Sequence, residues 1–356
     1  MINSRLSDLR RKMASENLGG IIISDRTNVF YLSGFSGSEG DLLITLDEAY
    51  IICDFRYLQQ AAEQCPLYTI RDIKEGIYNI INDIIIKHGI ARLGIEDRVV
   101  SNAVYSAMKR NIRGAELVGT AGLVASLKII KDDTEIANLT KAAELAVGAF
   151  HNVLDKIRPG ARECEIAAEL EYYMRKNGAS GTSFETVVAS GANSAKPHGT
   201  ASEKKIEIGD FVVMDFGCLY NGYCSDITRT VAVGNITKEQ RRVYNAVHFT
   251  QLKMLNLVAP GKVCSAIDGI SRNLLDMFGY KEFFGHSLGH GVGTEVHELP
   301  TLGPRGTDTL KPGMIVTVEP GVYFDNCFGV RIEDTVLVTE NGVKILCEAP
   351  KELIIL

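Results

Sequence analysis

The chain of 356 residues lacks the features of several common classes of protein. No segment reaches the roughly 18 uninterrupted apolar residues expected of a membrane-spanning helix. The first twenty residues are charged, and the spacing of Leu6, Leu9 and Met13 predicts an amphipathic helix rather than a signal peptide. We therefore expect no membrane partner.

Long basic runs and paired cysteines are missing as well. The net charge is −6, and no long run of lysine and arginine offers a surface for phosphate backbones, so we expect no nucleic-acid partner. The eight cysteines are scattered singly, without the Cys-x-x-Cys spacing of zinc or redox sites. This usage is typical of reduced thiols and favours a cytoplasmic location.

The first third of the sequence alternates short predicted strands with predicted helices. The strands are predicted at 21–24, 42–45, 49–53 and 93–96, and the helices at 55–64, 77–88 and 102–110. Such an alternation indicates a compact α/β domain. The run Asp132-Asp133-Thr134-Glu135 then predicts the start of a long helix. We place the boundary just before it, giving domains 1–125 and 126–356.

Two copies of one pattern occupy the second domain. Each copy has a Pro-Gly pair, a helical stretch, a strand that carries an acid near its end, and a second acid further along. The first copy contains Pro159-Gly160, a helix at 162–177, a strand at 211–216, Asp215 and Asp226. The second contains Pro260-Gly261, a helix ending near Phe278, a strand from Ile315, Glu319 and Glu333. Carboxylates inside apolar strands are costly unless cations accompany them, so the pattern indicates metal.

A hairpin signal in the first copy brings its two acids together. Asn221-Gly222 lies between strands predicted at 211–216 and 225–233, and Asn-Gly favours a two-residue turn. This turn places Gly217 opposite Asp226, so Asp215 and Asp226 become diagonal neighbours on one face, about 7–8 Å apart. Two such halves, packed about a pseudo-twofold axis, would bring all four acids to one centre.

Three of the seven histidines lie close together in the sequence, between the two acid pairs. His286, His290 and His297 are set among glycines that allow close approach of the backbone. One imidazole with four carboxylates and no thiolate is an oxygen-rich ligand set, which suits divalent manganese, cobalt, iron or zinc. Two divalent ions would cancel the four negative charges.

The strings around these residues resemble the pita-bread metallopeptidases, and within them the Xaa-Pro peptidase branch. They are Met214-Asp215-Phe216-Gly217, Asp226-Ile227-Thr228-Arg229-Thr230, Gly289-His290-Gly291-Val292-Gly293, Glu319-Pro320-Gly321 and Arg331-Ile332-Glu333-Asp334. The resemblance covers nearly the whole chain. It implies a creatinase-like α/β amino-terminal domain followed by an α+β pita-bread catalytic domain with an internal pseudo-twofold repeat.

The resemblance also implies roles for individual residues. Asp226 and Glu333 would bridge two metal ions, Asp215 would bind one of them, and His290 with Glu319 would complete the other. Glu319 would act as the general base. The residues expected to contact substrate are His198, His286, His297, Tyr323 and Arg331, with His198 and His297 near the scissile amide and His286 in the proline pocket.

The activity implied is hydrolysis of Xaa-Pro bonds by a dipeptidase (prolidase) that forms a homodimer and uses manganese. Aminopeptidase P, which acts on longer peptides, is the alternative. Methionine aminopeptidase shares the five ligands, but a whole domain precedes the repeat here. Creatinase acts without metal and lacks the ligand set. A catalytically inactive binding module is disfavoured because such relatives typically lose ligands.

Overall fold

The computed structural model describes all residues, 1–356, in two compact units, Met1–Leu127 and Lys128–Leu356. The helices of the first unit are α1 (Ile2–Ser15), α2 (Arg26–Ser33), α3 (Leu58–Gln64), α4 (Ile77–His88) and α5 (Asn102–Asn111), with the short helix η1 (Ile73–Glu75). Its strands are β1 (Gly20–Ile23), β2 (Asp41–Thr45), β3 (Ala49–Cys53), β4 (Thr69–Asp72), β5 (Arg92–Ile95) and β6 (Glu116–Gly119). The short helix α6 (Ala125–Lys128) spans the point at which one unit gives way to the next.

The strands of the first unit form one mixed sheet in the order β4-β3-β2-β1-β5-β6. Alternate residues of β1 enter different cores: Ile21 and Ile23 pack with α1, whereas Ile22 packs with α4. This alternation follows from the two-residue repeat of a strand, and it covers both faces of the sheet. The α/β domain predicted from the sequence is therefore confirmed.

One predicted helix of this unit begins too early. The helix expected at 55–64 starts at Leu58, because the residues before it form a turn. The amide of Tyr57 donates to the carbonyl of Asp54 over 3.0 Å, and the Asp54 carboxylate accepts from the amide of Arg56 over 2.9 Å. These bonds compete with a helical path for the same backbone groups.

The second unit contains four long helices and thirteen strands. The helices are α7 (Asp133–Val153), α8 (Glu163–Lys176), α9 (Lys238–Leu257) and α10 (Cys264–Asp276), with η2 (Leu154–Lys156), η3 (Gly191–Ala195) and η4 (Lys281–Phe283). The first seven strands are β7 (Gly181–Thr182), β8 (Val187–Ser190), β9 (Phe211–Phe216), β10 (Cys218–Tyr220), β11 (Tyr223–Cys224), β12 (Ile227–Ala232) and β13 (Gly289–Gly291). The others are β14 (Glu298–Leu302), β15 (Ile315–Val318), β16 (Gly321–Phe324), β17 (Phe328–Arg331), β18 (Asp334–Thr339) and β19 (Gly342–Ile345). None of the helices combines the length and apolar character that crossing a membrane requires.

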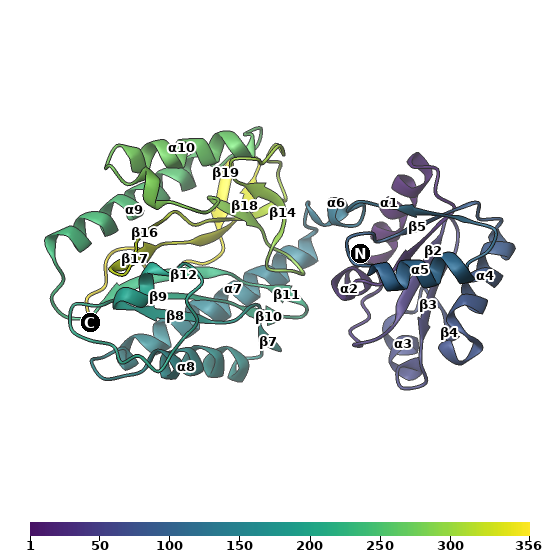
Figure 1. Cartoon of the computed structure of the whole chain (residues 1–356), viewed down its shortest axis with the longest axis horizontal. Helices are drawn as coiled ribbons and strands as arrows, with labels where there is room; N and C mark the ends of the chain where they lie inside the picture. Colours follow the sequence, from purple (N-terminus) through teal and green to yellow (C-terminus); the bar gives the residue numbers. More distant parts are fainter. The chain divides into compact units, whose positions relative to one another are not determined.

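The two sequence copies fold alike. In the first, the amide of Gly160 donates to Ile206 O and that of Glu163 to Lys204 O; in the second, Gly261 donates to Leu310 O and Cys264 to Asp308 O. These bonds pair the start of each second helix with the segment that leads into the acid-bearing strand. The strands lie between α7 and α8 on one side and α9 and α10 on the other (Figure 1). The predicted internal repeat is thus present in the fold.

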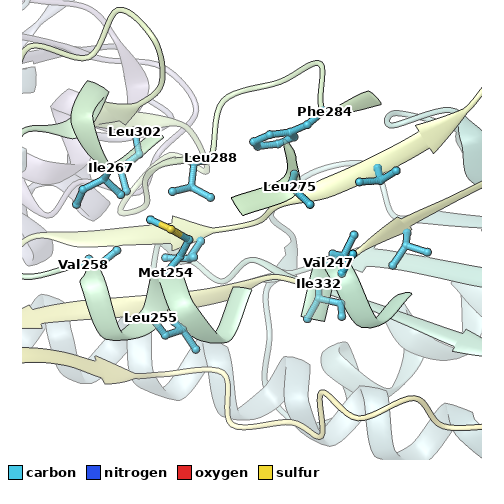
Figure 2. Close-up of a cluster of buried hydrophobic side chains, with 14 of the residues drawn as sticks. Val247, Met254, Leu255, Val258, Ile267, Leu275, Phe284, Leu288, Leu302 and Ile332 are labelled. Carbon is cyan, nitrogen blue, oxygen red and sulfur yellow. The ribbon is translucent and has the colours of Figure 1, made fainter. Parts of the chain in front are cut away.

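An apolar core fills the space under α9 and α10. Figure 2 shows side chains of α9 and α10 gathered with residues from the strands and loops of the second half. They include Val247, Met254, Leu255, Ile267, Leu275, Leu288, Leu302 and Ile332. Burial of such side chains at about 25 cal/mol per Å² is the main force holding the acid-bearing strands in place.

The hairpin of the first copy has the predicted register. β12 pairs with β9 so that Thr228 lies opposite Asp215, and β11 pairs with β10 across the turn at Asn221-Gly222. Asn221 and Gly222 both have positive φ, at 48° and 80°, as a tight primed turn requires. The same register places Gly217 opposite Asp226.

The predicted strand at 225–233 is interrupted at its start and begins at Ile227. Gly217 is the position at which the hairpin passes from one sheet to another. The Ser225 hydroxyl accepts from the amide of Cys218 over 2.9 Å, and Ser183 donates to the carbonyl of Ser225 over 2.7 Å. At this interruption, hydrogen bonds from the side chains of Ser225 and Ser183 replace the backbone hydrogen bonds of a regular strand pair.

The close approach at Gly217 leads to a stability prediction. A methyl group there would overlap the Ser225 carbonyl oxygen and the Ser183 hydroxyl. We expect Gly217→Ala to lower the free energy of unfolding by about 1–3 kcal/mol or more, as overpacking does. Gly269→Ala is the matched control, because no atom lies within 4 Å of the added carbon in α10. It should be neutral or stabilising by about 1 kcal/mol. Urea unfolding of both variants measures this, and equal midpoints would contradict it.

Candidate metal centre and active site

Four strands deliver the four acids to the centre of the second unit. Asp215 lies near the end of β9, Asp226 directly precedes β12, Glu319 follows β15, and Glu333 lies between β17 and β18. The two halves meet here, because the amide of Glu333 donates to the carbonyl of Thr228 over 3.1 Å. This contact brings the acids of both copies together, as the repeat predicts.

Three ligand types converge within this centre. One ligand atom each from Asp226, His290 and Glu333 lies within 4.8 Å of the others. The Nε2 atom of His290 is 3.6 Å from an oxygen of Asp226 and 3.4 Å from an oxygen of Glu319. These separations are too long for hydrogen bonds and leave room for a cation between the groups.

Two carboxylate oxygens of this centre have no hydrogen-bond partner although they are buried. They are Oδ1 of Asp215 and Oε1 of Glu333. A buried acceptor without a partner is costly, and few occur in native proteins. Oxygen atoms left without a donor beside a histidine nitrogen are what a divalent cation would bind, so the residues present fit a metal centre.

Burial and nearby negative charges disfavour the charged forms of Asp226, Glu319 and Glu333 in the absence of metal. Burial, followed by the charges of Glu333 and Asp215, raises the pKa of Asp226 well above its usual range. The pKa of Glu333 is raised by burial and by Glu319 and Asp215. Burial raises the pKa of Glu319 to about 8. The centre therefore stores electrostatic repulsion that cations would relieve.

His290 is arranged to offer a free nitrogen. Burial, and then the neighbouring His297, lower the pKa of His290 to about 4, so its ring is neutral at physiological pH. Its Nδ1 lies 3.1 Å from the carbonyl of Gly291, which can only accept. Nδ1 therefore carries the hydrogen, and Nε2 faces the acids with its lone pair free for a metal.

Arg331 contacts two of the acids, one directly and one through a threonine. Its Nη2 donates to Oδ2 of Asp215 over 2.5 Å, and its Nε donates over 3.0 Å to the hydroxyl of Thr228. That hydroxyl donates in turn to Glu333 over 2.6 Å. Arg331 thus holds Asp215 directly and Glu333 through Thr228.

Tyr323 joins Arg331 to His286 in a chain with a defined direction. Nη1 of Arg331 can only donate, and it bonds the Tyr323 oxygen over 2.7 Å. The phenol hydrogen is therefore directed to Nε2 of His286, 3.0 Å away, and Nδ1 of His286 donates to the Ser287 carbonyl over 2.8 Å. Burial raises the pKa of Tyr323 to about 12 and lowers that of His286 to about 4, so both stay neutral.

The remaining two predicted residues, His198 and His297, are exposed at the edge of the centre. The ring of His297 lies 4.3 Å from that of His290. Burial and His198 lower the pKa of His297, and the charge of Asp215 opposes them. His198 also lowers the pKa of His286, so this histidine lies near both. All ten site residues predicted from the sequence are therefore in one region of the second unit.

Two threonines whose hydroxyls bond the acids were not predicted from the sequence. Thr228 links Arg331 to Glu333, and Thr317 donates to Glu319 over 3.1 Å while accepting from the amide of His290 over 3.0 Å. Each threonine lies two positions from an acid. The two-residue repeat of a strand puts such pairs on one face, so this spacing could have found them.

The comparisons with known proteins agree with this arrangement. Residues 137–340 match the sequence pattern of metallopeptidase family M24, and residues 5–130 match the creatinase/prolidase N-terminal domain. The chain belongs to metallopeptidase family M24. It therefore has the pita-bread catalytic fold preceded by a creatinase-type domain, as predicted, and it is a metallopeptidase.

Three relatives of this M24 peptidase match it over nearly their full lengths. The Xaa-Pro dipeptidase of Pyrococcus furiosus is 39% identical, covering 99% of this chain and 100% of that one. The solved Xaa-Pro dipeptidase from Bacillus anthracis is 44% identical with a TM-score of 0.97, covering 100% of both chains. The solved X-Pro aminopeptidase from Thermotoga maritima is 36% identical with a TM-score of 0.90, covering 97% of this chain and 100% of that one.

The raised pKa values predict how the M24 peptidase loses stability when its metal is removed. A group whose pKa is higher in the folded state contributes stability at low pH and loses it as pH rises through that pKa. Glu319, with a pKa raised to about 8, and Asp226 and Glu333, whose pKa values are raised well above their usual range, should therefore lower the melting temperature between about pH 7 and pH 8. In this window the histidines of the unfolded chain, with a pKa of about 6.5, are mostly neutral.

Two substitutions isolate the contribution of the centre. Asp226→Asn removes one of the repelling acids, so its melting temperature should fall less steeply with pH. Asp325→Asn, in the exposed turn between β16 and β17, is the control and should keep the wild-type slope. Melting curves of chelator-treated protein measure both, and equal slopes for all three proteins would contradict the electrostatic origin.

Proposed function

We propose that this M24 peptidase is a Xaa-Pro dipeptidase that uses two divalent metal ions. The observation that carries the proposal is the gathering of His198, His286 and His297 around the acids, in a chain similar to Xaa-Pro dipeptidases over its whole length. The metal centre alone fits several hydrolases. The surrounding histidines and Arg331 provide contacts for a particular substrate.

The proposed ligands are Asp215, Asp226, His290, Glu319 and Glu333. Asp226 and Glu333 would bridge the two ions, Asp215 would bind one, and His290 with Glu319 would bind the other. When bound, the ions would activate water as a nucleophile and polarise the substrate carbonyl. The proposed metal is manganese, with cobalt, zinc or iron as alternatives that the same ligands accept.

Proton transfer is assigned to Glu319. Its Oε1 accepts from Thr317 over 3.1 Å, which leaves Oε2 as the oxygen that takes and returns a proton. His198 and His297, exposed at the edge of the centre, would donate to the oxygen on which negative charge develops and to the leaving nitrogen. Both imidazoles can approach substrate because neither is buried.

The choice of proline is assigned to His286, Tyr323 and Arg331. The nitrogen of the Xaa-Pro amide belongs to the proline ring and carries no hydrogen, so a peptidase cannot recognise it as a donor and must recognise the ring. His286 has both ring nitrogens engaged and packs edge to face on Phe284, with centroids 4.9 Å apart. Its ring would line the proline pocket.

An Xaa-Pro aminopeptidase acting on longer peptides is the second candidate. The similarity to the Thermotoga maritima X-Pro aminopeptidase over 97% of this chain supports it. The two activities differ in what limits the cleft beyond the proline. We also propose a homodimer in the cytoplasm; all eight cysteines are free thiols, which supports a reducing location.

The metal requirement is tested by removal. Treatment with a chelator should abolish cleavage of a Xaa-Pro dipeptide, and added manganese should restore it. Asp226→Asn should lower kcat/KM by more than about 100-fold, the upper range for loss of an outer-shell partner, because it removes a ligand itself. Asp325→Asn is the matched control and should retain wild-type activity. Unchanged cleavage after chelation would refute the proposal.

Substrate length separates the two candidate functions. For a dipeptidase, kcat/KM for a Xaa-Pro dipeptide should exceed that for the matching Xaa-Pro tripeptide by at least about tenfold, or 1.4 kcal/mol in transition-state binding. The assay is run in manganese, cobalt and zinc with Xaa-Ala substrates as controls. A preference for the tripeptide would identify an aminopeptidase, and equal cleavage of Xaa-Ala would exclude both.

A further inference from the structure

Glu163 is a buried carboxylate that the proposed reaction does not use. It is the first residue of α8, and its surface is 0% exposed. Its Oε1 accepts from the amide and the hydroxyl of Ser190, over 2.6 and 2.8 Å. Its Oε2 accepts from the amide and the hydroxyl of Ser202, over 3.1 and 2.5 Å. Nδ2 of Asn193 lies 3.2 Å from both oxygens.

Ser190 and Ser202 are the two ends of one segment, which we call the His198 segment (190–202). By bonding both ends and Asn193 between them, Glu163 closes this segment into a loop. On its other side, Nη1 of Arg331 donates to the carbonyl of Pro197 over 3.2 Å. The ring of His198 itself makes no hydrogen bond, so its position depends on how the segment is held.

No cation contacts the Glu163 carboxylate. The nearby ammonium of Lys204 bonds the hydroxyl of Ser190 over 2.9 Å and pairs with Asp210 over 2.7 Å. A buried carboxylate without a cation is costly unless hydrogen bonds satisfy both oxygens. The convergence of backbone and side-chain donors meets that condition. A neutral polar residue of the same size could not accept all of these bonds.

The second half holds a histidine in a related way. Asp268, one turn into α10 and 1% exposed, accepts from Nε of Arg272 over 2.7 Å and from the amide of Leu288 over 3.0 Å. Arg272 donates to the carbonyls of Phe284 and His286 over 2.9 and 2.7 Å. In both halves, a buried carboxylate on the second helix therefore anchors a segment that carries a substrate-facing histidine.

We propose that Glu163 is a positioning residue for His198. It acts by holding both ends of the His198 segment, so that the imidazole stays near His286 and His297 without bonds of its own. The role assigned to His198 rests on the proposed function. The placement of the segment by Glu163 does not, and it can be measured without substrate.

Glu163→Gln tests this directly. The NH2 group of the glutamine would replace one of the two carboxylate oxygens, and at either position it would face the N–H and O–H donors of a serine. The serine hydroxyl can rotate away, but the backbone N–H cannot. We expect hydrogen exchange in the His198 segment to become faster and kcat/KM for a Xaa-Pro dipeptide to fall by about 10- to 100-fold, as a small misplacement of a reacting group does. Glu171→Gln, an exposed position on the same helix, should change neither quantity.

A double-mutant cycle separates positioning from a general structural role. If Glu163 acts through His198, the substitution should cost less than about twofold when introduced into His198→Ala, and bound metal should equal that of the wild type. The same loss in both backgrounds, unchanged exchange, or loss of metal would overturn the proposal. If Glu163→Gln does not fold, Ser202→Ala removes only one donor and should show a smaller loss with the same non-additivity.

Failure of the proposed function would look different. In that case the wild-type chain itself would not cleave Xaa-Pro substrates, whereas the exchange comparison between wild type and Glu163→Gln would still decide whether Glu163 holds the segment. Slower or equal exchange in the variant refutes the positioning role whatever the substrate proves to be.

Discussion

The repulsion among four carboxylates, two of them buried and two half-buried, is the interaction on which the rest of the second unit depends. Apolar packing under α9 and α10 holds the strands together, and the ligand atoms of Asp226 and Glu333 lie close to each other. The single guanidinium of Arg331 offsets only part of the charge. Three groups in the centre still lack a partner. They are one oxygen of Asp215, one oxygen of Glu333 and the Nε2 atom of His290. The fold therefore presents a ligand set that is incomplete without cations.

Duplication explains how one chain can assemble such a centre. Each half repeats the same bonds between the start of its second helix and the segment before its acid-bearing strand. Each half also places one buried carboxylate on that helix, Glu163 or Asp268. The halves diverge at their loops, where one carries His198 and the other His286. The repeated scaffold thus positions the acids of both halves. The loops differ between the halves, so the site can contact the two different ends of a substrate with different residues.

Local patterns predicted the parts of this site that depend on neighbouring residues in the chain. Asn221-Gly222 correctly gave the pairing of Asp226 with Gly217, because a two-residue turn leaves one possible register. The interruption of the strand pairing at Gly217 could not be predicted from the local sequence, because it depends on the approach of Ser183. Nor could the partners of Glu163, which are 27 to 39 positions away in the sequence, or the contact of Arg331 with Asp215. Such contacts follow from tertiary packing rather than from spacing.

The chain of bonds from Arg331 through Tyr323 has a consequence for the chemical character of His286. Arginine offers no acceptor, so the polarity of every bond that follows is determined at that end. Both nitrogens of His286 are then committed, one as acceptor and one as donor, and its ring packs nearly at right angles to that of Phe284. An imidazole in this state has neither a hydrogen to give nor a lone pair to share. The ring therefore presents a flat, uncharged surface to a molecule that enters the site, and it can discriminate between substrates only by their shape.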